Sequence, residues 1–371
     1  LIMPTLNLPV AGGKIAAYTM QPPKQLPAAK PPFNRIAYAA AHVVPNPLAD
    51  NNPWLDHSID WDATMAFRRH VWSLGLGVAE AMDTAQRGMG MDWPNSLELI
   101  RRTLDAAKDF PGALVGSGTG TDHLEPSASV TVDDVIRAYE EQCAAVEKLG
   151  GRIVLMASRA LVKAARSPDD YAKVYGCVLS QVKQPVIIHW LGEMFDPALE
   201  GYWGHKDHMK AMDVAIDVIK ANAAKIDGIK ISLLDKDKEI AMRRRLPKGV
   251  RMYTGDDFNY AELIAGDSQG YSDALLGIFM QDRRDPEKSI VYIAERGQAP
   301  QRERDHAAGR EDVAPLRAQG TDRPHIAVRQ RGLIAGGRIG AHAVLVGRLL
   351  GRRGIGRHQT IDLRLVGLGN G

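Results

Sequence analysis

Short apolar runs alternate with longer amphipathic segments between residues 33 and 279. The apolar runs have the length of strands and fall at Arg35–Val44, Gly77–Met82, Ala113–Ser117, Arg152–Ala157, Pro185–Trp190, Gly228–Leu233, Val250–Thr254 and, more weakly, Gly270–Ala274. Apolar residues at helical spacing predict helices at Trp61–Leu74, Ser96–Lys108, Val132–Leu149, Pro168–Gln181, His208–Lys225 and Tyr260–Ala265. This alternation is typical of βαβ units and a parallel sheet.

Seven or eight such units in about 250 residues favour a closed barrel over an open, doubly wound sheet. The first strand is not followed by the Gly-x-Gly-x-x-Gly segment of dinucleotide-binding folds. We therefore predict the α/β class, with a (β/α)₈ TIM barrel as the catalytic domain at residues 33–279. Residues 1–32 combine an alternating stretch at Lys14–Thr19 with a Pro-rich run, which predicts an N-terminal arm or hairpin and a linker.

The character of the chain changes near residue 280. Residues 280–371 hold 16 Arg and a single Lys, and no Phe or Trp follows Phe279. The segment directly after Phe279 lacks the apolar stripe that an eighth barrel helix needs. Residues 280–371 are therefore interpreted either as a basic, partly disordered tail or as a non-native reading frame. Both interpretations predict an incomplete or aberrant C-terminal end of the barrel.

Composition narrows the functional classes. The 47 basic and 44 acidic side chains give a net charge of +3, which is no argument for binding nucleic acid. Two cysteines, Cys143 and Cys177, provide neither a disulfide framework nor a metal-binding spacing. No apolar run approaches the ~18 residues of a membrane span, and the N-terminus lacks the design of a signal peptide. We therefore expect a cytoplasmic protein with a small-molecule partner and no nucleic-acid or membrane partner.

Four segments carry a family resemblance: Pro185–His189, Asp227–Ser232 (Asp-Gly-Ile-Lys-Ile-Ser), Tyr253–Asp257 (Tyr-Thr-Gly-Asp-Asp) and Gly266–Ser272. In order and spacing they resemble the dihydrodipicolinate synthase and N-acetylneuraminate lyase family over residues 33–279, in the manner of a divergent branch. The resemblance implies a class I aldolase barrel, assembled as a homo-oligomer and working without an organic cofactor. It identifies Lys230 as the Schiff-base lysine.

The sequence departs from the family pattern in three places, the third being the stretch after Phe279, where the match stops and where an eighth helix and a small helical extension would follow. His189 stands where the family has its catalytic tyrosine, and Trp190-Leu191-Gly192 replaces the usual Asn-x-Pro. Met82–Arg87 occupies the place of the pyruvate-binding Gly-Thr-Thr-Gly-Glu signature. His42, at the end of the first predicted strand, can form a replacement polar pocket with Asp83, Thr84 and Arg87 of this segment, in which Arg87 is the clamp for a substrate carboxylate.

Lys230 is the central candidate for chemistry. It lies between Ile229 and Ile231 in an apparent buried strand, where loss of solvent lowers the pKa of a lysine. The neutral amine can attack a carbonyl, and the resulting iminium stabilises a carbanion. The alternative is a lysine that extends to the strand end or pairs with Asp256.

Three further residues are candidates around Lys230. His189 ends a strand and can relay protons if its imidazole titrates near neutrality, although a core histidine fits as well. Glu193 can orient His189 or bind a substrate hydroxyl, unless it is simply solvated. Of the adjacent Asp256 and Asp257, one can face the site while the other caps the next helix, and Asp256 is assigned to substrate binding. The Gly-rich segment at residues 117–122 either cradles a phosphate or sugar hydroxyls or is a plain loop.

These observations lead to a Schiff-base aldolase or lyase acting on a small, hydroxylated keto compound. No cofactor is required, because the iminium is itself the electron sink. Two alternatives remain open: a metal-dependent sugar isomerase or epimerase using His189, Glu193 and His208, and a non-catalytic barrel.

Overall fold

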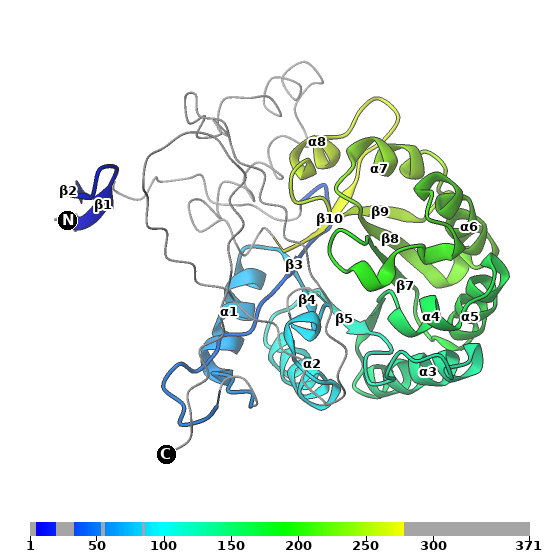
Figure 1. Ribbon diagram of the computed structural model, residues 1–371, viewed down its shortest axis with the longest axis horizontal. Coiled ribbons are helices and arrows are strands. Elements are labelled where there is room, and N and C mark those ends of the chain that lie inside the picture. Colours follow the sequence, from blue (N-terminus) through cyan, green and yellow to red (C-terminus); the bar gives the residue numbers. More distant parts are fainter. Residues whose placement is uncertain (1–4, 20–32, 53–55, 84–85, 278–371) are drawn as a thin grey trace, which may run out of the picture. The chain divides into compact units, whose positions relative to one another are not determined.

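The structure is a computed structural model that describes residues 5–19, 33–52, 56–83 and 86–277 (Figure 1). Contacts divide the chain into two units at Pro315, and every described residue belongs to the first. Thr84 and the whole segment after Gly277 lie outside the described residues. The predictions made for residues 280–371 therefore stay predictions.

The N-terminal residues form a hairpin. Strands β1 (Thr5–Val10) and β2 (Lys14–Thr19) pair antiparallel, with Leu6 opposite Tyr18. The turn uses Gly12 and Gly13 at φ of 81° and 71°, a region that side chains with a Cβ rarely adopt. All residues of both strands are exposed.

Eight parallel strands close into a barrel in the order β10-β3-β4-β5-β6-β7-β8-β9. Their bounds are β3 Ala37–Ala40, β4 Gly77–Glu80, β5 Val115–Thr119, β6 Arg152–Leu155, β7 Val186–Leu191, β8 Ile226–Ser232, β9 Arg251–Thr254 and β10 Asp273–Leu276. The predicted (β/α)₈ class is confirmed. All eight strands run the same way, so their C-terminal ends meet at one rim, where such barrels display catalytic groups.

Helices lie between and around the strands (Figure 1). The α-helices are α1 Trp61–Ser73, α2 Trp93–Ala107, α3 Val132–Lys148, α4 Arg159–Ala164, α5 Pro168–Gln181, α6 His208–Ala221, α7 Lys236–Arg243 and α8 Tyr260–Ala265. The part of the chain that the structure describes also contains four 3-10 helices: η1 Arg87–Met89, η2 Pro197–Leu199, η3 Tyr202–Gly204 and η4 Ala223–Lys225. Side chains cap the N-termini of several helices. The Asp60 carboxylate accepts a hydrogen bond from the Ala63 amide at the start of α1, and Thr131 forms a capping box with Asp134 at the start of α3.

Aromatic side chains fill the barrel interior near the N-terminal ends of the strands. Tyr38 and Tyr253 meet edge to face with ring centroids 6.1 Å apart, and the Tyr253 hydroxyl donates to Asp227 at 2.6 Å. Glycines make room for these rings: a Cβ at Gly77 or Gly228 would lie 2.6 Å from a tyrosine ring carbon. Because these rings fill the interior at the N-terminal ends of the strands, polar interior groups are left for the rim at the C-terminal ends.

Candidate active site

Lys230 points into the barrel from the middle of β8. Its neighbours Ile229 and Ile231 are buried in the layer between strands and helices, so strand alternation turns Lys230 inward. The side chain is 6% exposed and lies in register with His189 on β7 and Tyr253 on β9. The predicted strand and the inward placement of this lysine therefore agree with the structure.

A cavity of about 120 Å³ opens above Lys230. Its lining comes from five strand ends and comprises Ala40, His42, Leu191, Phe195, Lys230, Ser232, Gly255, Asp257, Leu275, Leu276 and Gly277. Burial lowers the pKa of the Lys230 ammonium from 10.5 to about 8, while the carboxylates of Asp257 and Asp83 oppose that fall. A usable share of neutral amine is therefore present near neutral pH.

Gly255 makes room for the lysine. A Cβ at this position would lie 2.7 Å from Lys230 Cε and 2.6 Å from the carbonyl oxygen of Ile231, and would also collide with the Ser232 hydroxyl. The Gly255 amide donates to Ile231 O at 2.9 Å, which fixes the backbone at this close approach. The glycine of the Tyr-Thr-Gly-Asp-Asp segment thus shapes the floor of the cavity.

The two adjacent aspartates lie in different surroundings, and the lining of the cavity contains Asp257 rather than Asp256, the residue that the sequence assigned to substrate binding. Asp256 Oδ1 accepts from the amides of Phe258 and Asn259 at 2.8 and 2.9 Å, and its Oδ2 accepts from the Asn259 side chain. Asp256 therefore closes the turn before α8, while Asp257 lines the cavity. Burial raises the pKa of Asp257, and the charge of Lys230 opposes that rise. Substrate binding by Asp256 therefore stays a prediction, and the described geometry favours Asp257.

His189 lies beside the lysine in the barrel interior. Its Nε2 is 3.3 Å from the Ser232 hydroxyl, and its buried Nδ1 has no partner within the described residues. Burial, followed by the charge of Lys230, lowers the pKa of His189 well below its ordinary value. This direction disagrees with an imidazole that titrates near neutrality, and the role of His189 as a proton relay stays a prediction. His189 is a neutral group that holds Ser232, which lines the cavity.

The remaining candidates divide between this cavity and other surroundings. His42 lines the cavity together with Lys230. Glu193 instead contacts His208 Nε2 at 3.1 Å, and Lys238 Nζ lies 3.2 Å from His208 Nδ1. Glu193 therefore joins a partly exposed chain of polar groups and is absent from the lining of the described cavity. Thr84 lies outside the described residues.

Arg87 is held in a bonded network that leaves little of it for a substrate. Its Nη1 donates to Asp122 at 2.8 Å and to Gln142 at 2.7 Å, and its Nη2 donates to the carbonyl of Gly118 at 3.0 Å. The Gln142 side-chain oxygen also accepts from the Gly120 amide at 2.7 Å. The geometry therefore gives Arg87 the task of fixing the Gly-rich segment, rather than that of a free carboxylate clamp.

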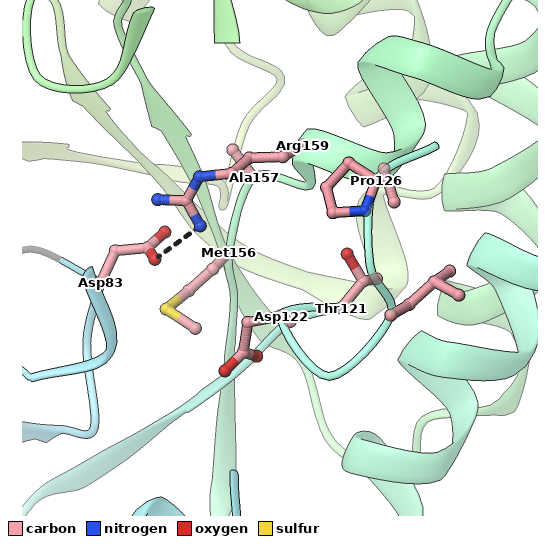
Figure 2. A pocket seen from close by; sticks show the side chains of 10 residues that line it. Asp83, Thr121, Asp122, Pro126, Met156, Ala157 and Arg159 are labelled. Atoms are coloured by element: carbon pink, nitrogen blue, oxygen red, sulfur yellow. Dashed lines mark ion pairs between the residues drawn. The ribbon is translucent and has the colours of Figure 1, made fainter. Parts of the chain in front are cut away.

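A second, smaller cavity lies over the ends of β4, β5 and β6. It measures about 50 Å³, and its lining comprises Asp83, Gly120, Thr121, Asp122, Leu124, Pro126, Met156, Ala157, Arg159 and Ala160. Arg159 and Asp83 point toward one another across it, with Nη1 and Oδ1 3.8 Å apart (Figure 2). Arg159 was not among the site residues predicted from the sequence. The available signal was its position shortly after β6, the fourth barrel strand along the chain, where a barrel presents side chains at its catalytic rim.

No three His, Cys, Asp or Glu side chains among the described residues are placed to hold a metal ion together. The residues proposed for a metal-dependent isomerase are separated by their contacts: His189 reaches Ser232, while Glu193 and His208 reach one another. The described geometry therefore does not assemble that set. Within the same residues, no helix has the length and apolar character needed to cross a bilayer.

Comparison with known proteins places this chain in a family. A family model matches residues 6–299, most of the 371-residue sequence. The chain belongs to the family described as Protein of unknown function (DUF993). The match to this DUF993 family runs past Phe279, so the family pattern continues beyond the boundary predicted from composition. No curated protein matches the chain.

Solved structures of dihydrodipicolinate synthases share the fold. The enzyme from Aquifex aeolicus aligns with a TM-score of 0.52 at 12% identity, over 74% of this chain and 78% of its own. The chloride-inhibited enzyme from Acinetobacter baumannii, complexed with pyruvate, gives 0.52 at 17% identity, over 74% and 81%. The enzyme from Bacillus clausii gives 0.51 at 14% identity, over 74% and 76%. At such identities the likeness shows the barrel fold alone.

Proposed function

We propose that this DUF993 member is a Schiff-base lyase of the class I aldolase type, which cleaves or forms a carbon–carbon bond in a small, hydroxylated keto compound. One observation carries the proposal: Lys230 lies buried at the floor of a cavity, with its pKa lowered to about 8. A buried lysine that donates no hydrogen bond to any described residue is costly to a fold, which favours a role in chemistry. The shared fold with dihydrodipicolinate synthases agrees with this role.

The proposed reaction begins at the neutral Lys230 amine. Its lone pair attacks the substrate carbonyl carbon, and loss of water leaves an iminium. The hydroxyl on the β-carbon, two positions from the iminium carbon, then gives up its proton. The bond between the α-carbon and this β-carbon breaks, and its electron pair passes through the α-carbon to the iminium nitrogen. An aldehyde leaves, and the enamine that remains is protonated and hydrolysed to release the keto product.

Asp257 is the proposed proton acceptor for the substrate hydroxyl. It lines the same cavity as Lys230, and the charges of the two residues influence one another. Its raised pKa brings the carboxyl closer to the range in which proton transfer is effective at neutral pH. Ser232, bonded to His189, supplies a hydroxyl that can donate to the substrate or accept from it.

Reductive trapping tests this proposal. Purified protein is incubated with pyruvate and other 2-keto compounds, reduced with borohydride, digested and examined by mass spectrometry. We expect a covalent adduct on the peptide that carries Lys230, and loss of that adduct in Lys230→Ala. Lys108→Ala, at a 75% exposed surface position on the α2 side of the barrel, is the matched control and should trap as the native chain does. An adduct that survives Lys230→Ala, or none with any keto compound, would contradict the proposal.

The homo-oligomeric assembly and the cytoplasmic location stay predictions.

A further inference from the structure

The smaller cavity at the ends of β4, β5 and β6 takes no part in the chemistry proposed for Lys230. Two of its charged residues differ in exposure: the Arg159 side chain is 32% exposed, whereas that of Asp83 is 5% exposed. Burial raises the pKa of Asp83, while Arg159 and then Arg87 oppose that rise. The buried carboxyl group of Asp83, beside the partly exposed guanidinium of Arg159, needs a hydrogen-bonding partner.

The Arg159–Asp83 pair is incomplete as a direct contact. Arg159 Nε donates to Asp196, which orients the guanidinium. The 3.8 Å between Nη1 and Asp83 Oδ1 is too long for a hydrogen bond, although the two groups face each other (Figure 2). A hydroxyl oxygen placed beside both groups can accept from Nη1 and donate to the carboxylate. This gap therefore fits a group that both donates and accepts.

The local charges disfavour an anion in this cavity. Among the direct ion pairs at this cavity, Arg87 pairs with Asp122, whereas Asp83 and Asp196 share the one guanidinium of Arg159. With one carboxylate in excess, a second anion would be repelled, and Arg159 is already partly neutralised. Neutral hydroxyl groups meet no such penalty.

The cavity lies within reach of the lysine. The charge of Asp83 raises the pKa of Lys230, so the two residues interact through the barrel interior. Met156 lines the smaller cavity and packs in the same interior cluster as Ala40 and Leu275, which line the cavity of Lys230. A flexible methionine is a wall that can adjust when a longer substrate spans both cavities.

We propose that Asp83 and Arg159 form a subsite for the neutral, hydroxylated chain of the substrate, so that the enzyme selects uncharged polyhydroxylated aldehydes as the partner of the lysine-bound keto compound. This inference rests on the proposed function. A polar subsite of this kind discriminates strongly against an analogue without the hydroxyl, because the buried carboxylate and guanidinium are then left unpaired.

The test compares four-carbon aldehydes of different chemistry. With pyruvate as donor, kcat/KM is measured for erythrose, butyraldehyde and succinic semialdehyde, which carry a hydroxylated, an apolar and an anionic chain. The native chain should prefer erythrose. Arg159→Met and Asp83→Asn should each lower that preference by roughly 10-fold or more, the loss expected for a hydrogen bond to a charged group. Arg159→Lys, which keeps the charge but not the fork, should fall between.

Controls separate this inference from the proposed function. Arg101→Met, on the exposed face of α2, should leave the aldehyde preference unchanged. Pyruvate trapping on Lys230 should persist in the Arg159 and Asp83 variants, and melting temperatures show whether each variant is folded. Trapping with an unchanged erythrose preference overturns the subsite and leaves the proposed function intact. A preference for succinic semialdehyde that Arg159→Met abolishes overturns it too.

If no keto compound is trapped on Lys230, the proposed function fails and the aldehyde assay cannot be run. A binding measurement then tests the subsite by itself. Saturation-transfer NMR with erythritol reports on the subsite without turnover. A signal in the native chain that is lost in Arg159→Met supports the subsite. Equal signals in the two proteins, or none in either, overturn it.

Discussion

The charge state of Lys230 yields a quantitative prediction. A lysine with a pKa of about 8 is neutral in roughly one molecule in ten at pH 7, whereas at the ordinary 10.5 it is neutral in roughly one in 3,000. Burial therefore enlarges the reactive fraction by a factor of roughly 300. The rate of trapping should rise about tenfold per pH unit below pH 8 and level off above it.

The assay is single-turnover trapping with pyruvate and cyanoborohydride from about pH 6 to about pH 10, followed by mass spectrometry of the Lys230 peptide. Peptides with exposed lysines provide an internal reference for the reactivity of the reagents. Asp257→Asn adds a directional test. The Asp257 carboxylate raises the pKa of Lys230, so its removal should move the midpoint to lower pH. Asp105→Asn, on the surface of α2, should not move it.

Two results would refute this reasoning. A midpoint close to 10 would mean that Lys230 is solvated like a surface lysine, and that its burial does not govern its chemistry. A midpoint that stays in place or rises in Asp257→Asn would mean that the carboxylate is not coupled to the amine. The midpoint is the deciding quantity because the rate itself also changes if Asp257 transfers a proton.

Two more predictions concern packing and burial. Gly255→Ala should slow trapping on Lys230 by at least about 10-fold, because the new Cβ meets Lys230 Cε at 2.7 Å and an unyielding backbone oxygen at 2.6 Å. Gly176→Ala, with nothing within 4 Å, is the control and should be neutral or stabilising by up to about 1 kcal/mol; equal trapping in both variants would show that the close approach is harmless. Burial raises the pKa of Glu239 to about 7, so between about pH 4.5 and pH 7 the unfolded chain releases a proton that the folded chain keeps, and stability falls as pH rises. Glu239→Gln should remove this loss, on the order of 3 kcal/mol, in urea unfolding at pH 5 and pH 8; an unchanged difference between these two pH values would count against the buried carboxyl.

Periodicity was sufficient for the barrel because its strands and helices differ so clearly in apolar spacing. Seven of the predicted strands overlap the observed ones closely, and the weak eighth, at Gly270–Ala274, begins ahead of β10 at Asp273–Leu276. Two helices escaped prediction. The six residues of α4 are too few to show a helical period, and α7 opens with the charged run Lys236–Glu239, whose apolar stripe is narrow.

The site was only partly predictable, because spacing along a strand fixes direction but not partners. Strand alternation placed Lys230 inside, and position at a strand end placed His42 at the rim. The direction of two adjacent side chains on a turn depends on local hydrogen bonds, so Asp256 and Asp257 could not be told apart from sequence. Likewise Arg87 looked available for a substrate until its contacts with Asp122 and Gln142 were seen.

Two sets of buried charges among the described residues differ in their bonding, and the difference argues for where function lies. Between the strands and the outer helices, the Arg68 guanidinium donates two hydrogen bonds of 2.8 Å to the Glu80 carboxylate, and the Thr103 hydroxyl donates a third. Such a pair offsets its own desolvation through complete bonding and needs no ligand. Inside the barrel, Lys230 donates no hydrogen bond to any described residue, and the 3.8 Å between Asp83 Oδ1 and Arg159 Nη1 is too long for a hydrogen bond. Charges that a fold buries without completing their bonds are costly, and here both face cavities at the C-terminal rim. We infer that a bound substrate completes these bonds. When thermal unfolding is measured with and without pyruvate, pyruvate should therefore raise the melting temperature of the native chain by more than it raises that of the Lys230→Ala variant.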